Sequence, residues 1–172
     1  MSIQHKHNGT AVKVPPRYRI EVAAKYGQDD PHGAALSSQL ASIGLPASLD
    51  VRVSSLYELI GTMTKHHIQT LSRDLLTDPI TQEFRLDDTA SSPAFLIGPH
   101  WRVEVWLKPT VTDPTGESVR EAVGDLGLPR PEQVRTGTAY RILGNARRPQ
   151  IDRLLNKLLS NPLIHETIVQ EL

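Results

Sequence analysis

The sequence predicts an α+β fold made of two tandem β-α-β-α-β units, and three observations support this prediction. Shifting the 172-residue chain by 83 positions (101 minus 18) aligns residues 18–89 with residues 101–172 without a gap, and 20 of the 72 aligned pairs are identical. A fixed period of this kind indicates a repeated structural unit. Strand-like and helix-like hydrophobic patterns also follow one another in the same order in both copies. The chain therefore contains two tandem copies of one fold unit.

The first element of each unit is predicted to be a half-buried strand, because apolar and polar residues alternate in it. The alternation sets Ile20, Val22 and Ala24 against Arg19, Glu21 and Ala23, and Val103, Val105 and Leu107 against Arg102, Glu104 and Trp106. Glu21 and Glu104 are equivalent carboxylates, and each lies two residues from an arginine. We expect both to lie on the solvent side of the strand and to form cross-strand ion pairs, without a catalytic role.

A helix follows in each unit, and an Asp-Pro-x-Gly motif starts it. The motif comprises Asp30, Pro31 and Gly33 in the first unit and Asp113, Pro114 and Gly116 in the second. Aspartate at the N-cap accepts from free amides of the first turn, and proline fits the first helical position because its missing N–H costs nothing there. Apolar residues recur at helical spacing at Leu36, Leu40 and Ile43, and at Val119, Ala122, Val123 and Leu126. Gly44 and Gly127 are predicted to end the helices in a left-handed conformation.

A long strand, a second helix and a short closing strand complete each unit. The long strand is predicted over Gln133–Leu143, where Gly137 indicates a bulge or the close approach of another backbone. Ser54 replaces this glycine in the first unit, so its strand is expected to run straighter. The second helix has an apolar face at Ile68, Leu71, Leu75 and Leu76, and at Ile151, Leu154, Leu155, Leu158 and Leu159. It ends at Asp78-Pro79 and at Asn161-Pro162, and closing strands are predicted at 84–86 and 167–169.

These patterns divide the chain into four segments: a flexible tail at 1–16, a first unit at 17–87, a linker at 88–100 and a second unit at 101–172. The linker is rich in Ser, Pro and Gly, although Phe95, Leu96 and Ile97 are expected to dock on the folded units. We interpret His5 and His7 of the tail as solvated side chains rather than metal ligands.

The composition is typical of a soluble globular protein and excludes several functions. Hydrophobic residues make up 38%, charged residues 22%, and the formal net charge is zero, so no overall field favours nucleic acid or an anionic membrane. The absence of cysteine excludes disulfides, thiolate metal sites and cysteine nucleophiles. No apolar run approaches the roughly 20 residues of a membrane span, and the polar start has no signal core. A cytoplasmic protein is expected.

The sequence contains no recognisable catalytic motif. Glycine-rich nucleotide loops, the Gly-x-Ser-x-Gly elbow and the His-Glu-x-x-His motif are all absent, so we assign no catalytic residue and no metal ligand. His66-His67 is interpreted as part of a helix start. Lys65 with His66, and Arg147 with Arg148, form a basic spot near the second helix of each unit, which would attract an anion. We favour a solvated surface or a contact with an acidic partner.

Some residues recur in both copies and are candidates for contact with a partner. Arg52 and Tyr57 recur as Arg135 and Tyr140, and these side chains either brace the long strand or face a partner, two interpretations that stay open. The full set of candidate partner-binding residues is Arg52, Tyr57, Arg135, Gly137, Tyr140, Arg147 and Arg148.

Four motifs of the second unit occur in a familiar order. They are Val-x-Val-x-Leu-Lys at 103–108, Asp-Pro-x-Gly at 113–116, Val-Arg-x-Gly-x-x-Tyr at 134–140 and Leu-Leu-x-Asn-Pro-x-Ile at 158–164. This order resembles the PurS family, the small subunit of formylglycinamide ribonucleotide amidotransferase, also called phosphoribosylformylglycinamidine synthase. The first unit matches in layout but departs at Ser54 and at Thr77-Asp78-Pro79, where the family has Ala-Asn-Pro.

The resemblance implies two PurS-like units packed as an intrachain pseudo-dimer, with fusion raising their effective concentration to about the millimolar range. It also implies a non-catalytic subunit that bridges an ATP-dependent synthetase subunit (PurL-type) and a glutaminase subunit (PurQ-type) in de novo purine biosynthesis. That complex would use ATP, Mg²⁺ and glutamine, while this chain would bind no cofactor. The lack of cysteine agrees that the chain is not the glutaminase. No nucleic-acid or membrane partner is expected, and further self-association stays open.

Two other classes of function compete with a bridging subunit. One is a tandem sensor of small molecules with a ligand site between the two units. The other is a self-contained enzyme, which would need clustered titratable groups that the sequence does not place together.

Overall fold

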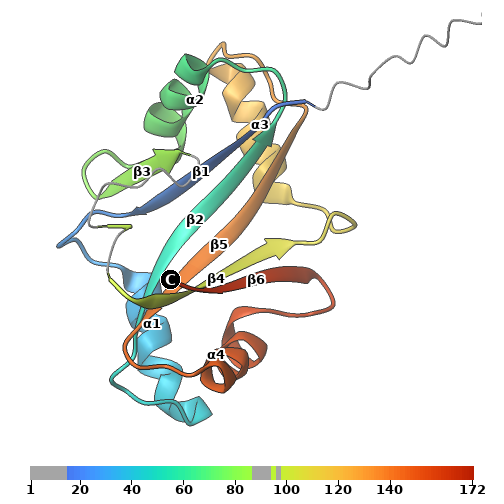
Figure 1. The fold of residues 1–172 in the computed structure, drawn as a ribbon. Helices are drawn as coiled ribbons and strands as arrows, with labels where there is room; N and C mark the ends of the chain where they lie inside the picture. Colours follow the sequence, from blue (N-terminus) through green and yellow to red (C-terminus); the bar gives the residue numbers. More distant parts are fainter. Residues whose placement is uncertain (1–14, 87–93, 96–97) are drawn as a thin grey trace, which may run out of the picture.

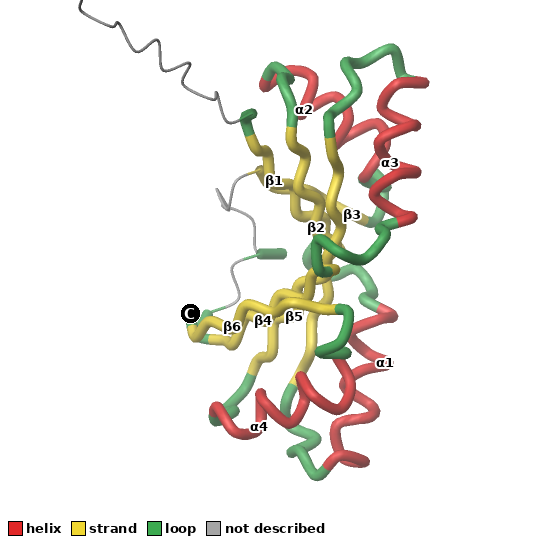
Figure 2. Tube along the Cα trace, turned by 90° about the vertical axis from the view of Figure 1, so that its right-hand side faces the viewer, coloured by secondary structure: helices red, strands yellow, loops and turns green. Residues whose placement is uncertain are grey.

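The computed structural model describes residues 15–86, 94–95 and 98–172. It contains one six-stranded antiparallel sheet in the order β3-β1-β2-β5-β4-β6. The helices lie on one face of this sheet (Figures 1 and 2). The α+β class and the packing of two β-α-β-α-β units as an intrachain pseudo-dimer are therefore confirmed.

Both units contain the same elements in the same order. The first consists of β1 (Arg17–Ala24), α1 (Pro31–Gln39) with a 3₁₀ turn η1 (Leu40–Ile43), β2 (Asp50–Ile60), α2 (Lys65–Leu71) with a π-helical turn η2 (Ser72–Leu76), and β3 (Gln82–Leu86). The second consists of β4 (His100–Leu107), α3 (Pro114–Asp125), β5 (Gln133–Leu143), α4 (Arg148–Leu154) with a π-helical turn η3 (Leu155–Leu159), and β6 (His165–Glu171). The closing strands β3 and β6 extend beyond the predicted residues.

The two units meet along β2 and β5, which pair over all 11 of their residues. In this register Ser55 faces Thr138, and the two are also equivalent in the repeat, since 55 plus 83 is 138. The same shift turns the pair of Asp50 and Leu143 into the pair of Gln133 and Ile60. An approximate two-fold axis therefore passes between Ser55 and Thr138 and relates the units.

Each hydrophobic core is shared between the two units. One core is made by Leu40, Leu45, Leu49 and Val51 of the first unit with Trp101, Val103, Val105, Ile142, Ile151, Leu154, Leu155 and Leu159 of the second. The other is made by Val123 and Val134 of the second unit with Ile20, Val22, Leu59, Met63, Ile68 and Leu71 of the first. Figure 1 accordingly shows α1 near α4 and α2 near α3.

The two helices of one unit therefore do not both cover that unit's own strands. The reason is the length of β2 and β5, which reach across both halves of the molecule (Figure 1). Helix α1, which packs against the first residues of β2, therefore lies over strands of the second unit. Helix α3 likewise lies over strands of the first unit. The helices are exchanged between the units.

The Asp-Pro-x-Gly motif ties the first helix of each unit to a strand. Asp113 Oδ1 accepts from the backbone N–H of Gly116 at 2.8 Å, and its Oδ2 accepts from the N–H of Thr136 in β5 at 2.6 Å. Asp30 makes the equivalent bonds to α1 and β2. A Cβ on Gly116 would lie 2.4 Å from the carbonyl oxygen of Val134, so the helix can approach β5 this closely only with glycine. The aspartate thus caps the helix and also satisfies a strand amide.

Parts of the predicted tail and linker lie outside the described residues. His5, His7, Leu96 and Ile97 are among them, so their predictions stay untested. Phe95 is described and is only 3% exposed, and its ring packs against guanidinium groups on the sheet, which confirms its docking. In the described part of the chain, no helix has the length and apolar character that crossing a membrane requires.

Candidate functional site on the charged face of the sheet

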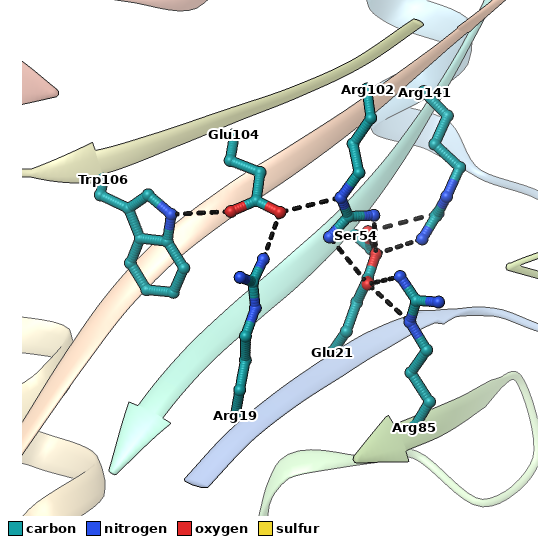
Figure 3. Close-up of polar contacts among 8 residues, drawn as sticks. All are labelled: Arg19, Glu21, Ser54, Arg85, Arg102, Glu104, Trp106 and Arg141. Carbon is teal, nitrogen blue, oxygen red and sulfur yellow. Dashed lines mark hydrogen bonds and ion pairs between the residues drawn. The ribbon is translucent and has the colours of Figure 1, made fainter. Parts of the chain in front are cut away.

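One face of the sheet lies opposite the helices (Figure 2). It carries a cluster of charged side chains, and we call this side of the sheet the charged face (Figure 3). Its members come from β1 to β5 and are Arg19, Glu21, Ser54, Arg85, Arg102, Glu104, Trp106 and Arg141. Glu21, Arg102, Glu104 and Arg141 are each no more than 3% exposed. Buried charges of this kind are stable only when they are paired and hydrogen-bonded.

Glu21 of β1 has the larger number of partners. Arg85 of β3 donates to it through Nε at 2.8 Å and Nη2 at 2.6 Å, and Arg102 of β4 donates at 3.0 and 3.2 Å. Arg141 of β5 and the hydroxyl of Ser54 in β2 also donate to its carboxylate. Glu21 therefore connects five strands through charge-assisted hydrogen bonds.

Glu104 of β4 is the equivalent carboxylate of the second unit. It accepts from Arg102 Nε at 2.8 Å, from the indole N–H of Trp106 at 3.1 Å and from Arg19. Because Arg19 and Arg102 are themselves equivalent, each of these arginines crosses the two-fold axis to pair with the glutamate of the other unit. These two crossed pairs join β1 to β4 over the intervening strands β2 and β5 (Figure 3).

The two halves of the charged face differ in how the space beside each glutamate is filled. In the second unit Trp106 lies on Gly137, where a Cβ would come within 2.7 Å of the indole ring. The equivalent positions of the first unit hold Ala23 and Ser54. Arg141 takes the place of the indole there, because its guanidinium donates to Ser54 Oγ at 3.4 Å and to the nearby glutamate. The two units have thus diverged in a complementary way.

Of the two alternatives predicted at Gly137, the bulge is wrong and the close approach of another backbone is confirmed. Gly137 pairs with Leu56 on one side and with Trp106 on the other in uninterrupted ladders. The close approach is real, but it comes mainly from the ring of Trp106; a methyl group on Gly137 would also lie 2.9 Å from the carbonyl oxygen of Val105. The strand that contains Ser54 pairs just as regularly, and its straightness relative to β5 stays a prediction.

The network lowers the pKa values of both glutamates, as strong pairing predicts. Burial alone would raise the pKa of Glu21, but Arg141, Arg102 and Ser54 outweigh burial and lower it to about 2. The pKa of Glu104 is also lowered, because Trp106, Arg102 and Arg19 outweigh its burial. Burial lowers the pKa of Arg141, although its contact with Glu21 opposes this shift. Both glutamates are therefore anions in the folded protein at neutral pH.

The expectation that Glu21 and Glu104 lie on the solvent side is wrong, while ion pairing is confirmed. The alternating pattern correctly identifies which residues share a face of the sheet. A row of charged residues along a strand does not reveal whether other parts of the chain cover that face. One signal is available in the sequence: Arg19 with Glu21 recurs unchanged as Arg102 with Glu104, although much of the surrounding surface differs between the copies.

The recurring arginine and tyrosine of the long strands point to opposite faces of the sheet. Tyr57 and Tyr140 are half-buried on the helix face, each packed against one of the two cores, and burial raises the pKa of both. Arg52 and Arg135 lie at alternate positions, on the charged face. One flat partner surface could not contact both residue types at once.

The two equivalent arginines also differ in their contacts. Arg135 pairs with Glu58 at 3.3 Å and with Glu166 at 2.5 Å, so it links β5 to its neighbour β2 and, across β4, to β6. Arg52 pairs locally, with Asp50 at 2.9 Å, and its side chain is 49% exposed. Of these two candidates, Arg52 is the one that solvent reaches more freely.

The basic residues near the second helices lie at helix starts. Arg148 of α4 pairs with Asp152 one turn later at 2.8 Å, and Arg147 is the N-cap residue. In the first unit Thr64 caps α2, and its backbone N–H donates to His67 Nδ1 at 3.3 Å. The interpretation of His67 as a helix-start residue is confirmed.

The charged face holds the strands together through ion pairs and hydrogen bonds. Both buried glutamates are saturated by guanidinium and indole donors. Across the described residues no group of three or more His, Asp or Glu side chains is arranged to hold a metal ion. Its chemistry is that of a structural clasp between the two units.

A groove lies on the opposite side, at the boundary between the units. It has a volume of about 490 Å³ and is lined by His32 and Gln39 of α1, and by Ser55, Thr138 and Tyr140 of the two central strands. The two-fold axis passes along its floor, between Ser55 and Thr138. This is the feature to which the sensor hypothesis refers.

Comparison with known proteins agrees with the repeat. The family model "PurS: Phosphoribosylformylglycinamidine (FGAM) synthase" matches the chain twice, over residues 17–89 and 100–171. None of the curated proteins compared with the chain matches it.

Two solved structures are similar to single units. PurS of Methanocaldococcus jannaschii, described as one of the subunits of formylglycinamide ribonucleotide amidotransferase in the purine biosynthetic pathway, is 24% identical over 44% of this chain and 96% of its own, with a TM-score of 0.39. PurS of B. subtilis is 25% identical over 44% of this chain and 99% of its own, with a TM-score of 0.39. Because the two family matches together span most of the 172 residues, the chain belongs to the PurS family of FGAM synthase, as a tandem fusion of two PurS units.

Proposed function

We propose that this chain is the non-catalytic bridging subunit of phosphoribosylformylglycinamidine synthase. It joins an ATP-dependent synthetase subunit (PurL-type) to a glutaminase subunit (PurQ-type) in de novo purine biosynthesis. ATP, Mg²⁺ and glutamine are used by these partners, and the chain itself binds none of them. The complex works in the cytoplasm.

The observation that carries this proposal is the repeat of one PurS unit about the axis between Ser55 and Thr138. A pseudo-dimer presents two related surfaces on one rigid body, which suits a subunit that holds two different proteins. The buried charges of the described residues support the same conclusion, because they form ion pairs that join the two units. The chain also lacks the cysteine that a glutaminase nucleophile requires.

Reconstitution of the three purified proteins tests the proposal. We expect synthesis of the amidine product from glutamine to require the chain, whereas synthesis from added ammonia by the synthetase subunit should proceed without it. Equal glutamine-dependent rates with and without the chain would contradict the proposal. So would turnover by the chain alone.

The groove between the units supports a second candidate, a sensor of small molecules. Its volume of about 490 Å³ is in the range of ligand pockets, and its lining combines apolar side chains such as Leu36 and Val53 with a few polar groups that would orient an uncharged ligand. A ligand that binds the folded chain raises its melting temperature. A panel of nucleotides and amino acids that leaves the melting temperature unchanged would remove this candidate.

A further inference from the structure

The two units present apolar side chains to solvent at equivalent turns. We define the first tip as residues 25–29 with 78–82, and the second tip as residues 108–112 with 161–165. The three most exposed large apolar side chains of the described residues are Tyr26 at 78%, Ile80 at 78% and Leu163 at 81%, and all three lie on these tips. Ile164 of the second tip is a further 38% exposed.

Both tips are held in one conformation by the same set of bonds. In the first, Lys25 Nζ donates to the carbonyl oxygen of Pro79 at 2.5 Å, and the N–H of Ile80 donates to Asp78 Oδ1 at 2.8 Å. The backbone N–H of Lys25 also donates to the carbonyl oxygen of Thr81 at 2.9 Å. The turn is therefore ordered before any partner arrives.

The second tip repeats this construction. Lys108 Nζ donates to the carbonyl oxygen of Pro162 at 2.5 Å, the N–H of Leu163 donates to Asn161 Oδ1 at 3.0 Å, and the N–H of Lys108 donates to the carbonyl oxygen of Ile164 at 2.9 Å. Single apolar residues on a surface need no explanation. An aliphatic side chain about four-fifths exposed at the same place of both units, on a turn fixed by the same bonds, is a different case, because it adds nothing to either core.

The tips lie on opposite sides of the molecule and differ in chemistry. Figure 1 shows the turn that leads into β3 on the left and the turn that leads into β6 on the right. The first tip combines Tyr26 and Ile80 with the exposed carboxylate of Asp78, whereas the second combines Leu163 and Ile164 with the neutral amide of Asn161. Two different partners could therefore bind at the same time, one at each tip, and the chemistry of each tip would distinguish them.

We propose that each tip docks one of the two partner subunits, so that the chain bridges them end to end. Ile80 inserts into an apolar pocket with a basic rim on one partner, which complements Asp78, and Leu163 inserts into an apolar pocket without that charge on the other. Rigid aliphatic and aromatic anchors of this kind lose little conformational freedom on binding. This inference rests on the proposed function, because it locates the surfaces through which the bridge is made.

Binding of the full-length chain to each purified partner subunit, measured by titration calorimetry, tests the inference. We expect Ile80→Asp to weaken binding of one partner at least about tenfold and to leave the other within about twofold, with Leu163→Asp giving the reverse pattern. Leu126→Asp is the matched control, because Leu126 is 45% exposed at the end of α3 and belongs to neither tip. The milder Ile80→Ala and Leu163→Ala variants, with their melting temperatures, exclude misfolding as the cause.

The outcomes separate this inference from the proposed function. If the unmodified chain binds both partners and neither tip variant weakens either, or if Leu126→Asp weakens binding equally, the tips are not the docking surfaces and the bridging function stands. Sedimentation analysis gives a second check: tip variants that only reduce self-association would assign the tips to a second copy of the chain and overturn the inference. If the unmodified chain binds neither partner, the bridging function itself fails.

Discussion

The buried carboxylate of Glu21 makes the stability of the fold depend on pH. Its pKa is lowered from 4.5 to about 2 in the folded state. A lowered pKa stabilises the fold fully above the unfolded value, and this contribution is lost as the pH falls from about 4.5 towards 2. The shift corresponds to about 3 kcal/mol.

Urea unfolding of Glu21→Gln and of the unmodified chain between pH 7 and pH 3 measures this contribution. At pH 7 we expect the variant to be less stable by about 3–5 kcal/mol, because three guanidinium groups lose their shared carboxylate. The difference should shrink as the pH falls, since protonated glutamate resembles glutamine. Glu171→Gln, at an exposed position of β6, is the control. A difference that does not change with pH would contradict this account of Glu21.

Gly137 is required by the ring that lies on it. An alanine there would bring its methyl group to 2.7 Å from Trp106 and 2.9 Å from the carbonyl oxygen of Val105. We expect Gly137→Ala to cost about 1–3 kcal/mol of unfolding free energy, as overpacking usually does. The same change in a Trp106→Ala background should cost less, and a double-mutant cycle by thermal unfolding measures the difference. If Gly137→Ala costs as much unfolding free energy in the Trp106→Ala background, the cost comes from the backbone and not from the ring of Trp106.

At the scale of elements, the aspartate of the Asp-Pro-x-Gly motif fixes a helix to a strand. Removing Asp113 leaves the first turn of α3 uncapped and the N–H of Thr136 without its acceptor. Losing a helix cap costs about 1 kcal/mol, and an unsatisfied buried amide costs about 1–3 kcal/mol. Asp113→Ala should therefore lose roughly 2–4 kcal/mol of unfolding free energy.

Asp125→Ala provides the matched control on the same helix. Asp125 is exposed at the C-terminal end of α3, where a negative charge gains nothing from the helix dipole, so its removal should change stability by no more than about 0.5 kcal/mol. Hydrogen exchange at the amide of Thr136 should accelerate in Asp113→Ala and stay unchanged in Asp125→Ala. Unchanged exchange in both variants would show that Asp113 is only a helix cap.

The order of elements could be predicted from the sequence, whereas their packing could not. Local signals such as Asp113-Pro114, the glycine caps and the alternation along β4 determine where helices and strands begin and end. An apolar stripe such as that around Val123 shows which side of a helix is buried, but it does not say against which strands. The exchange of α1 and α3 between the units therefore could not be predicted from the hydrophobic pattern of the sequence.

The burial of the charged face could not be predicted for a similar reason. The alternation correctly places Glu21 and Arg19 on one side of β1. Because both side chains are charged, that side would be expected to face solvent. Burial there depends on Phe95 of the connecting segment and on arginines that cross from distant strands. Contacts between residues 120 positions apart, such as Arg141 with Glu21, have no local signature.

At the scale of the whole molecule, the shared cores predict that the two units fold together. Neither core is complete in one unit, since Leu40 belongs to the same core as Ile151 and Val123 to the same core as Ile68. Residues 1–90 and 91–172, expressed separately, should each be less stable than the intact chain and should regain a cooperative melting transition when mixed. A half that melts cooperatively as a monomer, at the temperature of the intact chain, would contradict the sharing of cores.

The mixed pair should also be preferred over pairs of like halves. In a pair of second units, Arg141 of one copy would need the space that Trp106 occupies in the other. In a pair of first units, neither residue would be present to fill the space beside Glu21. Native mass spectrometry of the mixed halves should therefore show mainly the heterodimer, and equal amounts of all three pairs would contradict this complementarity.

The bridging role is tested most directly by the mass of the assembled complex. Sedimentation velocity of the synthetase and glutaminase subunits, with ATP, Mg²⁺ and glutamine present, should show one species that contains both catalytic subunits only when this chain is added. In the absence of the chain the two subunits should sediment separately. A complex of the two catalytic subunits that forms equally well without the chain would contradict the bridging role.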